Sequence, residues 1–483
     1  MFSSWNLLWI IPAGLLALWL IVILVRAISF RPKVQAAPAV DEAEVDENRA
    51  IESLQKMIQC KTISYFDEAL IDESEFDRFR ALLVERFPRV YAACKFERIG
   101  QSGLLYTLKG KKSDLPSVFM AHYDVVPANE EQWAKPAFDG IMEDDVLWGR
   151  GTLDTKGTLN GVMEAAEILL SKGFEPKQDL YFAFAGDEEV AGATQPTIVE
   201  TLRARGIKPA IVVDEGGAVV ENIFPGVKQP CALIGIGEKG MMNATMTIEG
   251  AGGHASAPPA HTSIGLLSRA ITEIEGHPFS RKLTKPVAEM FDTLGRHSSF
   301  AYRLIFSNLW CFMPLLDSIC KKSGGELNGM MRTTCAFTQM EGSEAINVLP
   351  PKASVGANLR IIGGETPQSA LAHLKKLADC EQIRFKDAYS MAPSPFSETT
   401  GEAWDKLTAA VQNTWPEALI SPYLMIACSD SRHYCAISDH VYRFSAMALS
   451  TEERSYIHGN NERIPIKKIV KTVQFYLRLM RSL

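Results

Sequence analysis

The stretch Ser117-Val-Phe-Met-Ala-His122-Tyr-Asp124 is a short apolar run followed at once by a histidine and, two residues later, by an aspartate. An apolar run of this length is typical of a buried strand. Two further runs, Leu180 to Ala185 and Ala210 to Val213, are also followed closely by acidic residues. Open α/β sheets form their active sites just beyond the carboxyl ends of the strands. The three runs therefore predict one sheet with a polar site at one edge.

The polar residues after these runs, and others further along the chain, are of types that bind metal ions. They are His122, Asp124, Asp154, Glu188, Glu189, Asp214 and His458. Imidazoles and carboxylates without cysteine suit zinc or a similar divalent ion, and a shared carboxylate can hold two ions. An isolated His-x-Asp is weak evidence, and adjacent acids usually form a solvated face. Because the acids stand at strand ends, the pattern favours a paired-metal hydrolase.

Seven short motifs extend the pattern along the chain. They are Ala121-His122-Tyr-Asp124-Val-Val-Pro127, Trp148-Gly-Arg-Gly-Thr-Leu-Asp154-Thr-Lys-Gly157, Gly186-Asp-Glu188-Glu189, Val213-Asp214-Glu-Gly216, Gly252-Gly-His254-Ala-Ser-Ala-Pro258, Asn347-Val-Leu-Pro350 and His458-Gly-Asn-Asn-Glu462. In this order they resemble the aminoacylase and carboxypeptidase family of zinc peptidases, from about Glu47 to the C-terminus. The chain looks most like the carboxypeptidase S branch, which also contains enzymes that make and break N-acyl amino acids. The N-terminal apolar segment, the insert around 291–328 and the runs 429–434 and 442–444 carry that second likeness.

The resemblance implies ligands for two zinc ions, with other divalent ions possible. One ion would be held by His122, Asp154 and Asp214, and the other by Asp154, Glu189 and His458, so that Asp154 bridges. Paired ions of this kind can share an activated water. Asp124 would accept a hydrogen bond from the ring of His122 and fix its tautomer. Glu188 would be the general base.

Three further residues gain roles through the resemblance. His254 would stabilise the oxyanion, either in its own site or in that of a neighbouring subunit, whereas the sequence alone allows a plain loop histidine. Asn347 and Arg360 would bind the free carboxylate of the substrate, with a surface ion pair as the alternative for Arg360. A cis peptide bond after Asp154, known in relatives, is a hypothesis here because Thr155 stands where the family often has Asp or Met.

Apolar periodicity divides the chain into domains. Over 47–238, strand-like and helical segments alternate, which predicts an α/β fold with a mostly parallel mixed sheet flanked by helices. After Glu238 the order becomes β-α-β-β-α, as in a ferredoxin-like module. The resemblance implies a zinc-exopeptidase-like catalytic domain with an inserted α+β lid or dimerisation-type domain over 239–363, and the catalytic domain resumes over 364–483. The aromatic-rich segment 291–325 does not fit that module. It could shape an apolar pocket, contact a membrane or be a helical insert packed on the lid.

The first 25 residues carry no charged side chain, and 5–25 supply the roughly 20 apolar residues that a transmembrane helix needs. A cleaved signal peptide is the alternative, but it would have a basic start and a shorter apolar core. We therefore expect a single-pass membrane anchor over 5–25 and a linker over 26–46. Arg26, Arg31 and Lys33 follow the span and favour a cytoplasmic catalytic domain. The resemblance implies an extracytoplasmic or luminal side, so the orientation stays open.

Composition narrows the functional classes. The chain has 483 residues, 47% of them hydrophobic, and can bury more than one core. A net charge of −7 argues against a nucleic-acid partner. Nine cysteines without a CxxC pair indicate scattered core thiols. The predicted function is zinc-dependent cleavage of the amide bond in short peptides or N-acyl amino acids with a free carboxylate, by a monomer or homodimer. The alternative is a catalytically disabled, membrane-anchored binding protein, which the complete ligand set disfavours.

Overall fold

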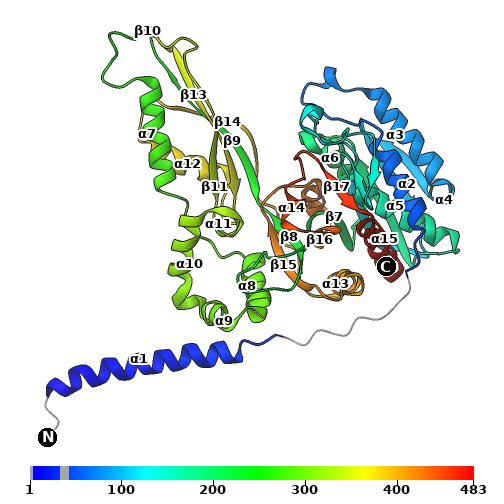
Figure 1. Ribbon diagram of the computed structural model, residues 1–483, viewed down its shortest axis with the longest axis horizontal. Coiled ribbons are helices and arrows are strands. Elements are labelled where there is room, and N and C mark those ends of the chain that lie inside the picture. Colours follow the sequence, from blue (N-terminus) through cyan, green and yellow to red (C-terminus); the bar gives the residue numbers. More distant parts are fainter. Residues whose placement is uncertain (1–3, 33–42) are drawn as a thin grey trace.

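The apolar run 117–121 lies in the middle of an eight-stranded mixed sheet (Figure 1). The computed structural model describes residues 4–32 and 43–483. In spatial order the strands are β1 (Lys95–Ile99), β2 (Gly103–Leu108), β6 (Gln178–Ala185), β3 (Lys112–His122), β7 (Ile211–Val220), β16 (Val441–Leu449), β8 (Cys231–Glu238) and β15 (Leu419–Met425). The three strands of the predicted site, β6, β3 and β7, are neighbours and parallel. Their carboxyl ends therefore meet at one edge, as the sequence predicts.

Helices cover both faces of this sheet. One face carries α2 (Glu47–Ile58), α4 (Pro88–Ala93), α5 (Lys156–Ser171), α13 (Glu402–Thr414) and α15 (Ile466–Ser482), and the other carries α6 (Thr194–Ala204). Along β3 the side chains alternate between two cores. Phe119 and Ala121 pack in the core that contains α5 and α15, whereas Val118 and Met120 pack against α6. A strand that is covered on both faces buries all of its side chains, so its sequence is one continuous apolar run.

A second, smaller sheet has its own core. It is fully antiparallel in the order β11 (Thr334–Glu341), β13 (Lys352–Ile361), β9 (Gly240–Glu249) and β14 (Arg384–Met391). The helices α7 (Ser263–Gly276) and α12 (Pro367–Ala378) pack on it. We call this unit the smaller domain and the eight-stranded unit the larger domain.

The predicted return to the larger domain at residue 364 is too early. Ala370 and Leu374 of α12 are buried in the smaller core, and β14 pairs with β9 as far as Met391. The smaller domain therefore continues to about residue 391. The turn after β13 was mistaken for a boundary, although the helix that follows it needs the smaller sheet to bury its apolar face.

The aromatic-rich insert is helical and belongs to the larger domain. It comprises α8 (Lys285–His297), α9 (Phe300–Phe306), α10 (Leu309–Ser323) and α11 (Gly325–Met331). Phe291 and Phe306 are buried and pack with tilted rings around Phe224, with ring centroids 5.8 and 4.6 Å from it. The helix α8 also packs on β15. The buried apolar side chains of these helices thus join the larger core, although α10 also forms an ion pair with Arg281 in the segment that leaves α7.

The N-terminal apolar segment forms one helix, α1 (Ser4–Ser29). Among the described residues, α1 is the single straight helix long and apolar enough to cross a membrane. Its apolar side chains from Ile11 to Val25 are mostly exposed. The predicted linker 26–46 begins inside this helix, and its residues 33–42 lie outside the described part of the chain. The larger domain begins with α2, whose N-terminus is capped by Asp46.

Candidate metal centre

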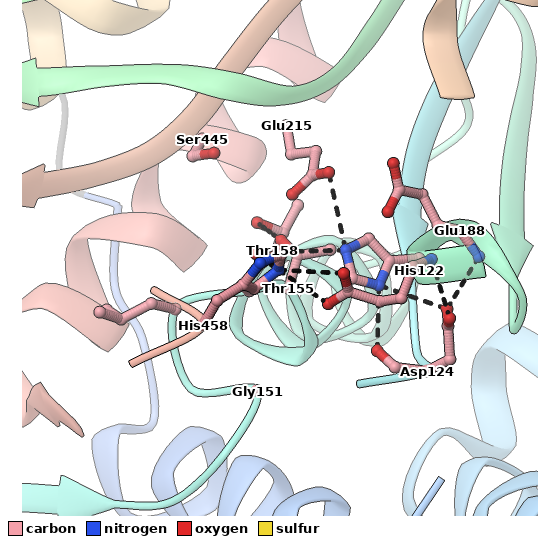
Figure 2. Close-up of polar contacts among 12 residues, drawn as sticks. His122, Asp124, Gly151, Thr155, Thr158, Glu188, Glu215, Ser445 and His458 are labelled. Atoms are coloured by element: carbon pink, nitrogen blue, oxygen red, sulfur yellow. Dashed lines mark hydrogen bonds and ion pairs between the residues drawn. The ribbon is translucent and has the colours of Figure 1, made fainter. Parts of the chain in front are cut away.

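Four segments far apart in the sequence converge at the carboxyl edge of the larger sheet (Figure 2). His122 ends β3, and Glu188 and Glu189 stand in a short 3-10 helix, η3 (Glu188–Val190), just after β6. Asp154 precedes α5. His458 lies in the loop after α14 (Thr451–Arg454) with a positive φ of 58°. The structure therefore brings together four of the five predicted metal ligands and the predicted base.

The carboxylate of Asp154 lies between the two histidines. Its Oδ1 is 2.9 Å from Nε2 of His122, and its Oδ2 is 3.1 Å from Nε2 of His458. Nε2 of His458 is also 3.0 Å from Oε2 of Glu189. The two oxygens of Asp154 thus face two different imidazoles. This is the arrangement that a bridging carboxylate requires.

The fifth predicted ligand, Asp214, faces away from this cluster. Its Oδ2 accepts a hydrogen bond from the backbone N–H of Ser431 at 3.0 Å. The next residue, Glu215, takes its place, with Oε1 3.6 Å from Nε2 of His122 (Figure 2). The prediction treated the strand as ending at Val213, but β7 continues to Val220. Neighbouring residues of a strand point to opposite faces, so only one of the two acids can face the site.

Asp124 contacts His122, as predicted, and three further groups. The Nδ1 of His122 lies 3.4 Å from its Oδ1 and 3.0 Å from its backbone oxygen. Its carboxylate also accepts the backbone N–H groups of Glu188 and Glu189, at 3.2 and 3.1 Å, and the hydroxyl of Ser64 at 2.7 Å. Asp124 therefore orients the imidazole and also holds the two glutamates at their backbone. The sequence indicated only the first contact.

Glu462 is a positioning residue that the sequence reasoning missed. It is fully buried, and Oε1 accepts the backbone N–H groups of Leu153 and Asp154 at 2.7 and 3.2 Å. Oε2 accepts Nη1 of Arg150 at 2.8 Å and the N–H of Gly151 at 3.0 Å. The loop that carries Asp154 is thus tied to the segment that carries His458. Its place at the end of the His458 motif was the available signal.

The peptide bond between Asp154 and Thr155 is cis. The hypothesis taken from relatives therefore holds for this chain, although Thr155 departs from the usual residue.

We expect Glu462→Gln to lower the free energy of unfolding by about 3 kcal/mol or more, because it breaks a buried ion pair. The amide NH2 group of glutamine is a donor, so it could not accept the hydrogen bonds that one of the glutamate oxygens accepts. Urea unfolding of the detergent-solubilised protein measures the free energy of unfolding, and the metal content of each variant is determined alongside. Glu131→Gln, a change at an exposed acid, is the matched control. Equal stability of the two variants would remove Glu462 from its positioning role.

The electrostatics of the cluster fit a bound cation. Burial raises the pKa of Glu188 well above its usual value and also raises that of Glu189. Burial and the neighbouring Asp154 raise the pKa of Glu215 to about 8. Several carboxylates this close together repel one another, and a divalent ion would favour their charged forms.

The donor set also fits a metal. Two triads have ligand atoms that all lie within 4.8 Å of one another, His122 with Asp154 and Glu189, and His122 with Glu188 and Glu215. Nitrogen and oxygen donors of this kind suit zinc and similar ions.

The three residues predicted to contact the substrate, His254, Asn347 and Arg360, lie on the smaller domain, and only the first two lie side by side. His254 is exposed in β10 (Gly253–His254), which pairs with β12 (Val348–Leu349) at the end of the smaller domain remote from the larger sheet (Figure 1). Exposed Asn347 accepts the N–H of Ala255 through its backbone oxygen, so it lies beside His254. Arg360 is near the opposite end of β13, a strand about 33 Å long, and donates to Cys428 Sγ at 3.3 Å. The predicted pair of Asn347 and Arg360 is therefore split within one chain.

Solved structures of low sequence identity share the fold. The M20 family metallo-carboxypeptidase Sso-CP2 from Sulfolobus solfataricus superposes with a TM-score of 0.67 and 17% identity, covering 90% of this chain and 99% of that one. Human carnosine dipeptidase 1 superposes with a TM-score of 0.65 and 14% identity, covering 90% and 97%. These likenesses show an α/β fold with a mixed sheet flanked by helices.

Sequence relatives are closer. The chain is 31% identical to the probable carboxypeptidase S-like 2 of Dictyostelium discoideum, over 99% of this chain and 95% of that protein. It is 32% identical to the N-fatty-acyl-amino acid synthase/hydrolase PM20D1 of Xenopus tropicalis, over 91% of this chain and 87% of that protein. Residues 118–482 match the family described as Peptidase family M20/M25/M40. The resemblance inferred from the seven motifs is confirmed, and the chain is a hydrolase that belongs to this peptidase family.

Proposed function

We propose that this protein is a dinuclear metallohydrolase that cleaves the amide bond of N-acyl amino acids or short peptides with a free carboxylate. The observation that carries the proposal is the convergence of two imidazoles, of His122 and His458, with four carboxylates, those of Asp154, Glu188, Glu189 and Glu215. The names of the relatives, carboxypeptidase S-like and N-fatty-acyl-amino acid synthase/hydrolase, support this substrate class. The disabled binding protein has no comparable support, because no expected group is replaced by an inert residue.

The proposed ligand set keeps the pattern of the family and puts Glu215 in the place of Asp214, because Glu215 lies near His122. One ion would be held by His122, Asp154 and Glu215, and the other by Asp154, Glu189 and His458. Bound zinc or a similar ion would supply Lewis-acid polarisation of the carbonyl and acidify a water. Asp124 and Glu462 hold these ligands in place through the contacts described above.

Glu188 is the proposed general base. Its side chain lies beside His122 and Glu215, and its backbone is held by Asp124 (Figure 2). The carboxylate takes a proton from the attacking water and delivers it to the leaving amide nitrogen.

The proposed substrate contacts come from the smaller domain. Arg360 lies at the junction of the two domains, where its guanidinium can bind a carboxylate. His254 and Asn347 are too remote to reach their own metal centre as the domains stand. We therefore assign them to the site of a second subunit in a homodimer, with closure over their own site as the alternative.

A substrate panel tests the proposed activity. Full-length protein in detergent, loaded with zinc, is assayed with N-acyl amino acids of increasing chain length, with dipeptides, and with the carboxamide of each. We expect hydrolysis of substrates that keep the free carboxylate and little turnover of the amidated ones. Equal turnover of the free-carboxylate and amidated substrates would argue against the carboxylate requirement. No turnover of any substrate in the panel would contradict the proposed substrate class.

Mixing two inactive variants tests the role of His254. Glu188→Gln and His254→Ala subunits should each be inactive alone. After co-refolding, roughly a quarter of the sites would be complete, because half of the dimers are mixed and one of their two sites has both residues. Recovery of activity near that level supports a shared site. Inactive mixtures would favour closure of each smaller domain over its own centre.

The proposal includes α1 as a membrane anchor. The helix is long enough to cross a bilayer and its apolar side chains are exposed. Such a surface is unfavourable in water and favourable in lipid.

A further inference from the structure

The C-terminal end of α1 is bound by the turn between α9 and α10. Nε and Nη2 of Arg26 donate to the backbone oxygen of Ser307 at 3.0 and 2.8 Å. Nδ2 of Asn308 donates to the backbone oxygen of Ile23 at 3.1 Å. Ile23 and Ala27, on the same side of α1, are fully buried. We call residues 299–323 the α9–α10 elbow.

The elbow exposes apolar side chains beside this junction. They are Phe300, Tyr302, Trp310, Leu315 and Ile319, of which the last three are more than half exposed. The other side of α10 buries Leu316 and Cys320 against the larger domain, together with Asp317, whose carboxylate pairs with Arg281 and Arg332. The exposed side, with Trp310, Leu315 and Ile319, is an apolar helix face of the kind that a core or lipid normally covers. The larger domain covers the side of α10 with Leu316 and Cys320, and no described residue covers the side with Trp310, Leu315 and Ile319.

The shape of the elbow suits the surface of a bilayer and not its full thickness. The two helices together are long and apolar enough for a span, but they bend by 105° at their junction. They meet α1 at residues 23–27, close to the end of its uncharged segment. Tyrosine and tryptophan concentrate at this level of membrane proteins, where the ring is in apolar surroundings and the polar atom reaches water.

A hollow of about 510 Å³ lies between α1, α8, α9 and α10. Its lining includes the guanidinium groups of Arg26 and Arg296, the rings of Phe30 and Trp310, and the carboxylate of Asp292, which accepts two hydrogen bonds from Arg296 at 2.7 and 3.1 Å. The Arg296 guanidinium stands 4.4 Å from the centre of the Phe30 ring. Arginine is well shaped to bind phosphate, and the rings offer an apolar wall. Asp292 balances the charge of Arg296, so the net positive charge of this lining is that of Arg26, and the rings suit the upper acyl chains of a lipid.

We infer that the α9–α10 elbow is a second membrane contact, lying among the lipid head groups and upper acyl chains of the bilayer that α1 crosses. The inference rests on the proposed anchor. Because α8 and α9 share a core with the larger sheet, contact at the elbow holds the catalytic domain in one orientation at the membrane surface. A tether by α1 alone would leave it free to rotate.

Photo-crosslinking tests this contact on the full chain in vesicles of phosphatidylcholine and phosphatidylserine. Trp310→p-benzoylphenylalanine and Ile319→p-benzoylphenylalanine carry the probe at the elbow. Ile346→p-benzoylphenylalanine is the control, since Ile346 is fully exposed and stands beside Asn347 at the far end of the smaller domain. After irradiation, mass spectrometry should detect phospholipid adducts on residues 310 and 319 and only background on residue 346.

Carbonate extraction of the same vesicles separates the two proposals. Protein that resists extraction but carries no lipid at 310 and 319 would overturn the elbow contact and leave the anchor standing. Release by carbonate would overturn the anchor, and the elbow inference with it. Crosslinks from residue 310 to a second copy of the chain, in place of lipid, would identify a self-association surface and also overturn the inference.

Discussion

Glu188→Gln should retain its metal ions and lose about a hundred- to ten-thousand-fold in turnover, the range typical for removal of a general acid–base group. Glutamine keeps the size of the side chain and its backbone contact with Asp124. It cannot take a proton from water. Elemental analysis of the purified variant measures the metal, and steady-state kinetics with an N-acyl amino acid measure turnover.

Glu189→Gln is the matched control for this prediction, because the adjacent glutamate contacts His458 directly. It should lose metal as well as activity. If Glu188→Gln turned over substrate at close to the wild-type rate, Glu188 would not be the base. If it lost its metal instead, the side chain would have to be regarded as a ligand, as its proximity to His122 and Glu215 permits.

Replacing residues that only support a metal ligand typically costs about 10- to 100-fold in metal affinity or activity. Glu215 is proposed to bind the ion directly, so Glu215→Gln should lose at least about a hundredfold. Asp214→Asn should change both by much less, because its amide oxygen can still accept the N–H of Ser431. Equilibrium dialysis against zinc and the same kinetic assay compare the two variants.

These adjacent acids allow a direct comparison, since both lie next to the site and their side chains point in different directions. Loss of metal in Asp214→Asn, with normal binding in Glu215→Gln, would restore the assignment first made from the sequence. Loss in both variants would indicate that Asp214 supports the strand position of its neighbour.

Local patterns in the sequence were sufficient for the larger sheet. Apolar runs ending in His122, before Glu188 and before Asp214 predicted three adjacent parallel strands, and the structure has β6, β3 and β7 in that arrangement. The motifs also predicted the family, which the relatives confirm. The roles of individual ligands, of His254 and of Arg360 remain predictions.

Long-range packing decided what the local patterns left open. The turn at residue 364 resembles a domain boundary until β14 is seen to pair with β9. The aromatic residues of the insert allowed a pocket, a membrane contact or packing on the smaller domain. Only the contacts of Phe291 and Phe306 with Phe224 assign the insert to the larger core.

The sequence by itself determined which residue types stand at the ends of which strands, because apolar runs and motifs are formed by residues that are close together in the sequence. The tertiary structure alone decided that Glu215 faces His122 while Asp214 turns away, and that Glu462 ties the loop of Asp154 to the segment of His458. The reason is physical. The direction of a side chain depends on where its strand continues and on what covers each face, and both are set by residues hundreds of positions away.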